Sequence, residues 1–160
     1  FLSSIGIGVI NLIFTIIGIS IIDKLGRKTL MVFGSIGYII SLTFIFLSFS
    51  FSWGGIILPV SLFLFIAAHA IGQGSVIWVY ISEIFPNHIR SSGQSFGTST
   101  HWVLAALIPS MIPFLFSNIG ASYVFLIFLL MMIFQLIFVI FSMPETKGKS
   151  LETLSNELLK

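Results

Sequence analysis

Long apolar stretches alternate with short polar clusters along this chain of 160 residues. Its charged residues all fall within three segments, at 23–28, 83–90 and 145–160. The two stretches between these segments contain 54 residues each without a charge. Because one helical membrane crossing takes about 20 residues, each stretch is long enough for two helices joined by a short turn. Two crossings return the chain to the side it left, so all three charged segments are predicted to face the same aqueous side.

This pattern predicts five transmembrane helices followed by a polar tail. The turns that reverse the chain on the uncharged side, at 50–55 and 117–122, are rich in Ser and Gly. Pro144 ends the fifth helix, and Ser150 is expected to cap a short amphipathic helix within the cytoplasmic tail at 144–160. The predicted spans, to within a few residues, are 1–22, 29–49, 56–82, 91–116 and 121–143.

Composition and charge place these spans in a membrane. Hydrophobic residues make up 57% of the chain and charged residues 8%, against about 25% charged in soluble domains. All seven Lys and Arg lie on one predicted side, and such a bias marks the cytoplasmic side. We therefore expect a multi-pass protein of the cell membrane, with its charged loops and C-terminus in the cytoplasm and the first residue outside. Because cysteine is absent, disulfides and thiolate metal sites are excluded.

The chain is expected to be a segment of a longer protein. It begins with Phe1 inside an apolar stretch, without the basic region and small-residue cleavage site of a signal peptide. Five helices also leave the first residue outside, which is unusual for a complete transporter or channel. The expected partners are the lipid bilayer and the missing upstream part of the same protein. No nucleic acid, metal or cofactor is expected.

Three motifs occur at the charged segments. They are D-K-L-G-R-K at 23–28, S-E-I-F-P-N-H-I-R at 82–90 after Trp78, and P-E-T-K-G-K at 144–149. In this order they resemble the sugar porters of the major facilitator superfamily, and the resemblance covers essentially the whole chain. It implies an all-α integral membrane fold of five transmembrane helices, the eighth to twelfth of a twelve-helix transporter. Such a C-terminal bundle would be incomplete without the upstream helices.

The same resemblance implies a conformational latch that joins the cytoplasmic ends of the helices and loosens as the transporter opens inward. Gly26 permits a tight reversal, and Asp23 can cap the helix or pair with Arg27. The alternative is that these charges only set the topology. Acidic residues beside the basic ones are unnecessary for that purpose, which favours the latch. Its expected members are Asp23, Gly26, Arg27, Glu83, Arg90 and Glu145.

A sugar site needs uncharged donors and acceptors beside aromatic rings, because a sugar offers hydroxyls and an apolar C–H face. His69 lies nine residues before Trp78, hence about 180° away around a straight helix. Both can face one cavity only if the helix bends, and Gly72 and Gly74 are the expected hinge. The resemblance implies that the substrate-binding residues are Asn11, His69, Gly74, Trp78, His101 and Trp102.

Several of these residues have simpler interpretations. Asn11 can join helices through hydrogen bonds, and His69 can bond a neighbouring helix. Gln135 is expected to bond a neighbouring helix and not the substrate. The family often has prolines where this chain has Gln73, Ser75 and Ile77. His101 stands where animal glucose carriers have an Asn and the bacterial xylose symporter a Gln, so the resemblance does not fix the substrate.

The function expected from the resemblance is transport of a monosaccharide by alternating access, either facilitative or coupled to H⁺. No Asp or Glu lies deep in the predicted spans, so a carboxylate proton relay is not expected in this segment. The alternative is a transporter-like sugar receptor or sensor without transport. A hydrolase built on Ser75 and His101 would need a positioned base and an oxyanion hole, for which the sequence gives no sign. We therefore expect no enzyme and no catalytic residue.

Overall fold

The computed structural model describes residues 2–53, 55–149 and 152, and within them the chain forms six α-helices. Gly72 alone separates the third helix from the fourth, so these two form one long span. By length and apolar composition the described chain then has five candidate membrane spans. This confirms the predicted all-helical fold with five spans. The helices are α1 (Leu2–Leu25), α2 (Arg27–Ser50), α3 (Ile57–Ile71), α4 (Gln73–Ile84), α5 (Arg90–Ile119) and α6 (Ala121–Phe141).

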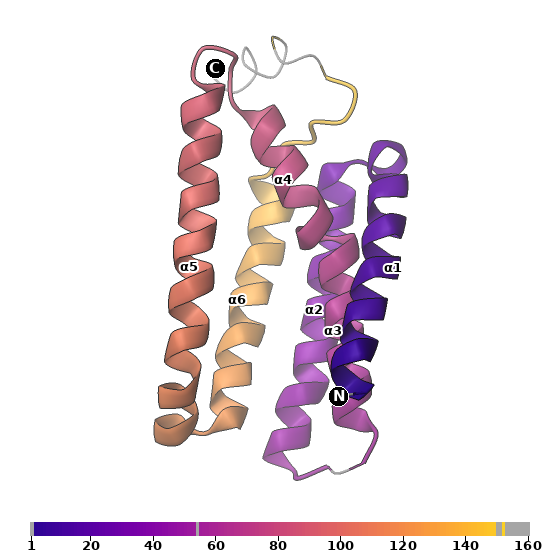
Figure 1. The fold of residues 1–160 in the computed structure, drawn as a ribbon, viewed down its shortest axis with the longest axis vertical. Coiled ribbons are helices and arrows are strands. Elements are labelled where there is room, and N and C mark those ends of the chain that lie inside the picture. The colour runs from indigo at the N-terminus through magenta and orange to yellow at the C-terminus, as the bar shows by residue number, and fades with distance from the viewer. Residues whose placement is uncertain (1, 54, 150–151, 153–160) are drawn as a thin grey trace.

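The charged segments lie together at one end of the bundle. Figure 1 shows the α1–α2 turn, the α4–α5 loop and the chain after α6 at this end, with the α2–α3 and α5–α6 turns at the other. The first charged turn is shorter than the sequence indicates, because α1 continues through Asp23 and Lys24. The chain then reverses at Gly26, whose φ of 92° and ψ of 161° favour glycine.

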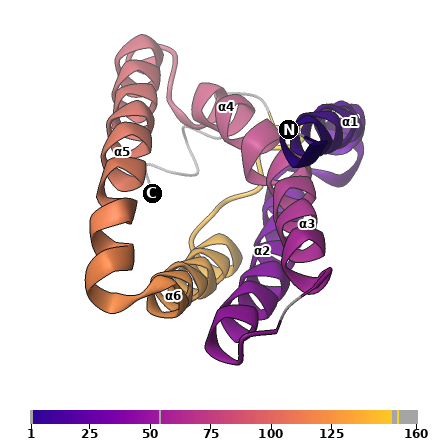
Figure 2. The ribbon, with the colours of Figure 1, turned by 60° about the horizontal axis from the view of Figure 1, so that its bottom comes forward.

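Helix α2 forms the centre of the bundle and α5 its margin. α2 packs on α3 and α6 and buries Leu30, Leu42 and Ile45 almost completely. Ser35 and Ser41 are also buried in α2, and each hydroxyl donates to a backbone carbonyl one turn earlier, at 2.7 and 2.8 Å. In contrast, α5 has no buried residue. It contacts only α4 and α6 within the described chain, and Figure 2 shows it set apart from α1 and α2.

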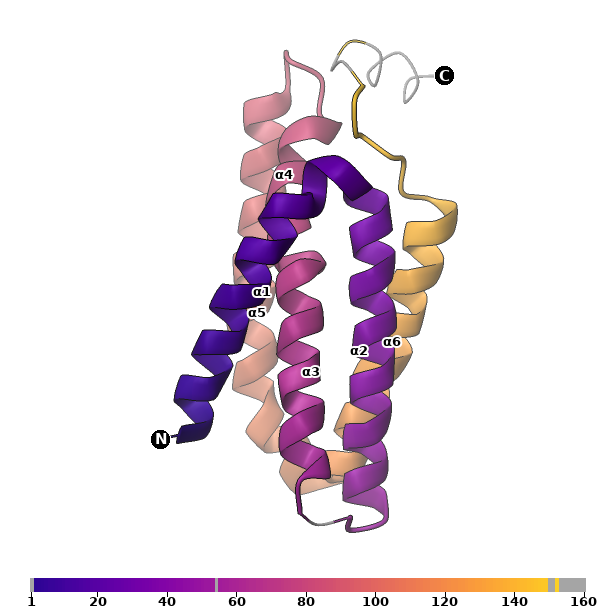
Figure 3. The same ribbon diagram turned by 90° about the vertical axis from the view of Figure 1, so that its right-hand side faces the viewer.

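The break between α3 and α4 lies where three helices meet. Gly72 has φ −87° and ψ −102°, which interrupts the helix, and Ser75 Oγ donates to the carbonyl of Ala70 at 2.5 Å. Figure 3 shows α3 between α1 and α2. A Cβ atom at Gly34 of α2 would lie 2.9 Å from Gly72 Cα, and one at Gly18 of α1 would lie 3.1 Å from Ile71 Cα. Glycine therefore allows both neighbouring backbones to approach the break.

The tail after α6 is described only in part. After α6, residues 142–149 run back along the charged end of the bundle. The predicted amphipathic helix after Ser150 lies outside the described residues, apart from Glu152.

Candidate functional site

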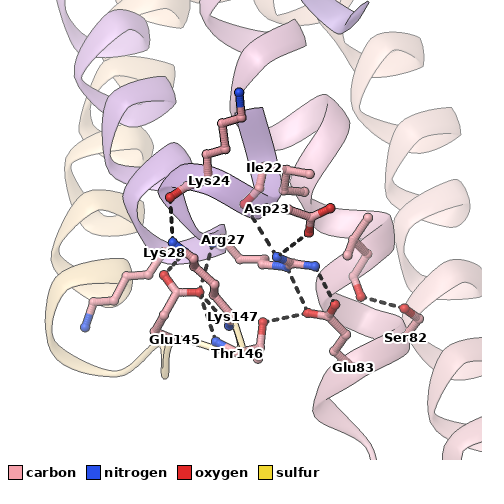
Figure 4. Close-up of polar contacts among 11 residues, drawn as sticks. Ile22, Asp23, Lys24, Arg27, Lys28, Ser82, Glu83, Glu145, Thr146 and Lys147 are labelled. Atoms are coloured by element: carbon pink, nitrogen blue, oxygen red, sulfur yellow. Dashed lines mark hydrogen bonds and ion pairs between the residues drawn. The ribbon is translucent and has the colours of Figure 1, made fainter. Parts of the chain in front are cut away.

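Arg27 is the centre of a network of charges at one end of the bundle. Its side chain is only 10% exposed. Two guanidinium nitrogens donate to both carboxylate oxygens of Glu83 on α4, with Nε to Oε2 at 3.1 Å and Nη2 to Oε1 at 2.7 Å. The third, Nη1, lies 2.9 Å from Oδ1 of Asp23 on α1 (Figure 4). Such a two-pronged contact fixes geometry as well as charge, so Arg27 joins three helix ends.

Glu145 supplies the cap that the start of α2 lacks locally. Its carboxylate accepts the backbone N–H groups of Arg27 at 2.9 Å and Lys28 at 3.0 Å, and also those of Thr146 and Lys147 at 3.0 Å. The first N–H groups of a helix have no partner within it, and the helix dipole favours an anion there. Burial raises the pKa of Glu145, but the four N–H donors outweigh burial and hold this pKa below its usual value.

Gly26 is required at this contact for a second reason besides its positive φ. A Cβ atom built on Gly26 would lie 2.5 Å from Oε2 of Glu145 and 2.8 Å from its Cδ. Any side chain at this position would therefore push the carboxylate away from the start of α2. The Gly of the first motif and the Glu of the third thus form one contact, although 118 residues separate Arg27 from Glu145.

Thr146 belongs to this network, although sequence reasoning did not select it. It is 3% exposed, and its hydroxyl donates to Oε2 of Glu83 at 2.6 Å. Two lysines form further hydrogen bonds between distant segments. Lys28 Nζ donates to the carbonyl of Ile140 at 2.8 Å, and Lys147 Nζ donates to the carbonyl of Lys24 at 2.5 Å. We call Asp23, Arg27, Glu83, Glu145 and Thr146 the charged network.

Arg90 lies outside the charged network, contrary to the expectation. Its Nε donates to the carbonyl of Phe85 at 3.4 Å, and its Nη2 is buried without a hydrogen-bond partner among the described residues. The Glu83 carboxylate instead accepts hydrogen bonds from Arg27 and Thr146. The network therefore joins α1, α2, α4 and the tail but not α5, and its role as a latch stays a prediction.

A cavity of about 360 Å³ lies beside the break between α3 and α4, within the usual range of about 300–1,000 Å³ for ligand pockets. Four of the six predicted substrate-binding residues line it, namely His69, Gly74, Trp78 and His101. Because the helix is interrupted at Gly72, His69 and Trp78 face the same cavity. We call this cavity the central pocket; its other lining residues are Met31, Gln73, Ile77, Gln135, Phe138 and Val139.

Aromatic rings form one wall of the central pocket. Trp78 on α4 is 40% exposed, and the ring of His101 on α5 meets it edge-on, with centroids 4.9 Å apart. Trp102 borders this pair without lining the pocket, since its ring lies 5.4 Å from that of His101 and 6.4 Å from that of Trp78. The wall gives a flat apolar surface beside a group that can donate or accept a hydrogen bond.

Asn11 does not join the central pocket. It is exposed on α1, which packs on α2, α3 and α4 and has no close backbone contact with α5 or α6 in the described chain. Asn11 is not among the residues that line the central pocket. Its role as a substrate-binding residue stays a prediction for the complete transporter.

Polar side chains that sequence reasoning assigned little weight, Gln73 and Gln135, also line the central pocket. Gln73 and Gln135 both donate to the buried Oγ of Ser35, at 3.1 and 3.2 Å, which confirms that Gln135 bonds a neighbouring helix. His69 Nδ1 lies 2.5 Å from the hydroxyl of Tyr38. Gln73 and Gln135 also line a second, apolar cavity of about 380 Å³ between α2, α3 and α6. The only sequence signal for these side chains was a few polar residues in apolar spans.

The chain matches a family model described as "Sugar (and other) transporter" over residues 1–158. It is 38% identical to the arabinose-proton symporter of Bacillus subtilis over 155 residues, covering 96% of this chain and 33% of that protein. It is 33% identical to the D-xylose-proton symporter of Escherichia coli, covering 96% of this chain and 32% of that protein. It is 30% identical to the facilitated glucose transporter member 2 of Rattus norvegicus, covering 99% of this chain and 31% of that protein.

The fold is also that of a solved sugar transporter. The inward-open conformation of the xylose transporter XylE from Escherichia coli superposes with a TM-score of 0.92 and 34% identity, covering 98% of this chain and 36% of that one. The same transporter bound to 6-bromo-6-deoxy-D-glucose gives a TM-score of 0.88. The chain thus spans about a third of the length of the relatives that it matches.

Proposed function

Because the chain belongs to the sugar transporter family of the major facilitator superfamily, we propose that it is the C-terminal part of a carrier that moves a monosaccharide by alternating access. The family is one of membrane transporters, so the chain is not an enzyme. In this proposal the five spans are the eighth to twelfth of twelve, and the remaining helices complete the binding cavity from the other side.

The central pocket is the observation that carries this proposal. It combines an aromatic wall with uncharged hydrogen-bonding groups, and the described spans place no carboxylate beside it. A sugar ring needs this combination, because its C–H face packs on an aromatic ring while its hydroxyls need partners. A pocket at an interrupted helix is also typical of transporter binding sites. In this role Trp78 supports the sugar ring, and His69 and His101 hold its hydroxyls.

The charged network would be the part of the carrier that opens and closes. It ties together the ends of α1, α2 and α4 and the tail, so opening the bundle at that end requires some of these contacts to part. A ligand shifts such an equilibrium only through contacts that differ between the two states. Sugar bound against α4 can do so, because α4 carries both Trp78 of the pocket and Glu83 of the network.

Energy coupling is assigned in this proposal to helices outside the segment. Relatives named above include proton symporters and a facilitated transporter, so H⁺ is a candidate coupling ion. Within the described segment, the titratable groups lining the central pocket are His69 and His101. Uptake by the complete transporter that responds to a pH gradient would assign it to the proton-coupled class.

The network end is proposed to face the cytoplasm. Because the segment contains no cysteine, a single cysteine introduced into it can be labelled selectively with a membrane-impermeant maleimide in a complete transporter whose other part has been made cysteine-free. Lys24→Cys at the network end should be protected in intact cells, whereas Ser52→Cys in the opposite turn should react. The reverse pattern would overturn the proposed orientation, and reaction of both variants on one side would overturn the helix count.

Transport is tested by tracer counterflow in liposomes that contain the complete transporter. Vesicles loaded with unlabelled pentose or hexose should transiently accumulate the same labelled sugar, because a carrier exchanges substrate across the membrane. A receptor or sensor would bind the sugar at equilibrium without accumulating it. Absence of both counterflow and binding for all monosaccharides, with folded protein, would defeat the proposal.

A further inference from the structure

The two ring nitrogens of His69 have different surroundings. Nδ1 lies 2.5 Å from the hydroxyl of Tyr38 on α2. Nε2 lies beside Gly74, where an added Cβ atom would be 3.0 Å from it. His69 and Gly74 both line the central pocket. Nε2 is therefore the nitrogen at the pocket wall, and glycine at position 74 leaves it uncovered.

Tyr38 is buried in the bundle. It is 6% exposed, and its ring packs on that of Phe65 with centroids 4.6 Å apart. The hydroxyl reaches His69 from a different helix, and no other hydrogen bond to it occurs within the described chain. A phenol fixed in this way can determine how a neighbouring imidazole is oriented and protonated.

The direction of the hydrogen bond follows from the proton of the phenol. A neutral imidazole has one N–H donor and one unprotonated nitrogen that accepts. If Nδ1 carried the hydrogen, the phenol O–H would be buried without an acceptor among the described residues, at a substantial cost. The favoured arrangement is therefore that Tyr38 donates to Nδ1. The hydrogen of His69 then lies on Nε2, at the pocket wall.

We propose that Tyr38 is a positioning residue that holds His69 in the Nε2–H form, so that His69 donates a hydrogen bond to one hydroxyl of the bound sugar. This inference rests on the proposed function. It adds to that function the direction of the hydrogen bond between His69 and the sugar, and a role for Tyr38, which does not itself touch the sugar. Discrimination follows, because a sugar that lacks this hydroxyl leaves the N–H unpaired.

Sugar affinity and selectivity test the proposal in the complete transporter. The dissociation constant is measured for the transported sugar and for each of its monodeoxy analogues. Tyr38→Phe should weaken binding of the parent sugar about three- to tenfold, the range of one net hydrogen bond. The preference for the parent sugar over one deoxy analogue should shrink by a similar factor. Tyr123→Phe is the matched control, because Tyr123 is exposed in the first turn of α6. It should change neither the affinity nor the selectivity.

A double-mutant cycle separates positioning from packing. His69→Phe keeps an aromatic ring but removes both nitrogens, and it should abolish the same selectivity. Added to His69→Phe, the Tyr38→Phe change should have no further effect on affinity, because the two residues act through one contact. Additive losses of affinity would overturn the proposal and make Tyr38 a packing residue.

The protonation of His69 is also directly measurable, even if Tyr38→Phe does not fold. Nitrogen-15 magnetic resonance of histidine-labelled transporter, with His69→Phe used for assignment, should show the hydrogen on Nε2 and an unprotonated, hydrogen-bonded Nδ1. A hydrogen on Nδ1 would overturn the inference. Failure of the wild type to bind any monosaccharide would instead overturn the proposed function, so the two failures are distinguishable.

Discussion

The charged network and the central pocket are the two polar regions of this bundle, and they differ in how fully their hydrogen-bonding groups are paired. In the network, the Glu145 carboxylate accepts four backbone N–H groups, and Arg27 pairs with two carboxylates. In the pocket, Gln73 Oε1 is buried without a partner in the described chain. Likewise, His101 makes ring contacts but no hydrogen bond there.

This difference indicates two kinds of role. A fully paired network holds its members in one arrangement and resists exchange with water. A polar group that remains exposed, as His101 does, is available to a ligand or to helices outside the segment. Variants of the network should therefore change stability and conformation, whereas variants of the pocket should change affinity. Variants of the complete transporter test this separation, and the largest effect is expected in the network.

Loss of Arg27 should have the largest effect. Arg27→Ala would leave the Glu83 carboxylate without its cationic partner in a partly buried site, and we expect about 3 kcal/mol of destabilisation. Thermal unfolding in detergent measures this loss. Lys24→Ala removes a charge from the same turn, but the Lys24 side chain is exposed. The melting temperature of this variant should therefore stay near the wild-type value. Equal losses of stability in Arg27→Ala and Lys24→Ala would mean that the total charge of the turn determines stability and that the pairing of Arg27 with Glu83 does not.

Gly26→Ala should have the second-largest effect, a destabilisation of about 2–3 kcal/mol. Strain at a glycine-only backbone position costs about 1–3 kcal/mol, and the new Cβ atom also displaces the Glu145 carboxylate. Gly120→Ala is a matched control, since Gly120 has similar angles, φ 84° and ψ 154°, and nothing within 4 Å of an added Cβ. The excess loss in Gly26→Ala measures the contact with Glu145. If the two variants melt at the same temperature, backbone strain alone explains the glycine.

In the pocket, Trp78→Ala should weaken sugar binding about tenfold, or about 1.4 kcal/mol, with a much smaller change in melting temperature. The reason is that Trp78 is partly exposed and forms a wall of the pocket. Binding is measured by equilibrium titration with labelled sugar. Trp53→Ala, in the turn between α2 and α3, should leave affinity unchanged. Parallel losses of affinity and stability in Trp78→Ala would identify it as a packing residue.

Acidification should produce the smallest effect. Because the folded-state pKa of Glu145 is lowered, its contribution to stability is complete above about pH 4.3, the usual value for Glu. It is lost as pH falls through the lower folded pKa. Melting temperatures between pH 6 and pH 3 should fall less steeply in Glu145→Gln than in the wild type. Glu152→Gln in the tail should follow the wild type, and identical slopes in all three proteins would contradict the cap.

Sequence spacing was sufficient to predict the spans and the shared side of the charged segments, because a bilayer excludes charge from long apolar stretches. The spans, and the helix break that glycine allows, are properties of the chain taken one helix at a time. The family resemblance, and not the spacing, placed His69, Gly74, Trp78 and His101 at one sugar site.

Side-chain contacts between different helices could not be predicted from the sequence pattern. The pairing of Thr146 with Glu83, and of Tyr38 with His69, depends on how distant helices pack, which periodicity does not encode. Arg90 was misplaced for the same reason, since only the packed structure shows that Glu83 pairs with Arg27 and Thr146. The predicted contact of Asn11 with the sugar stays a prediction, since Asn11 is absent from the lining of the central pocket in this segment.

A density map of the complete transporter with its bound monosaccharide, at a resolution that defines the sugar ring, tests the central claim most directly. We predict a sugar ring packed against Trp78, with one hydroxyl within hydrogen-bonding distance of His69 Nε2. Sugar bound elsewhere, for example in the apolar cavity between α2, α3 and α6, with the central pocket empty, would contradict the assignment of the pocket.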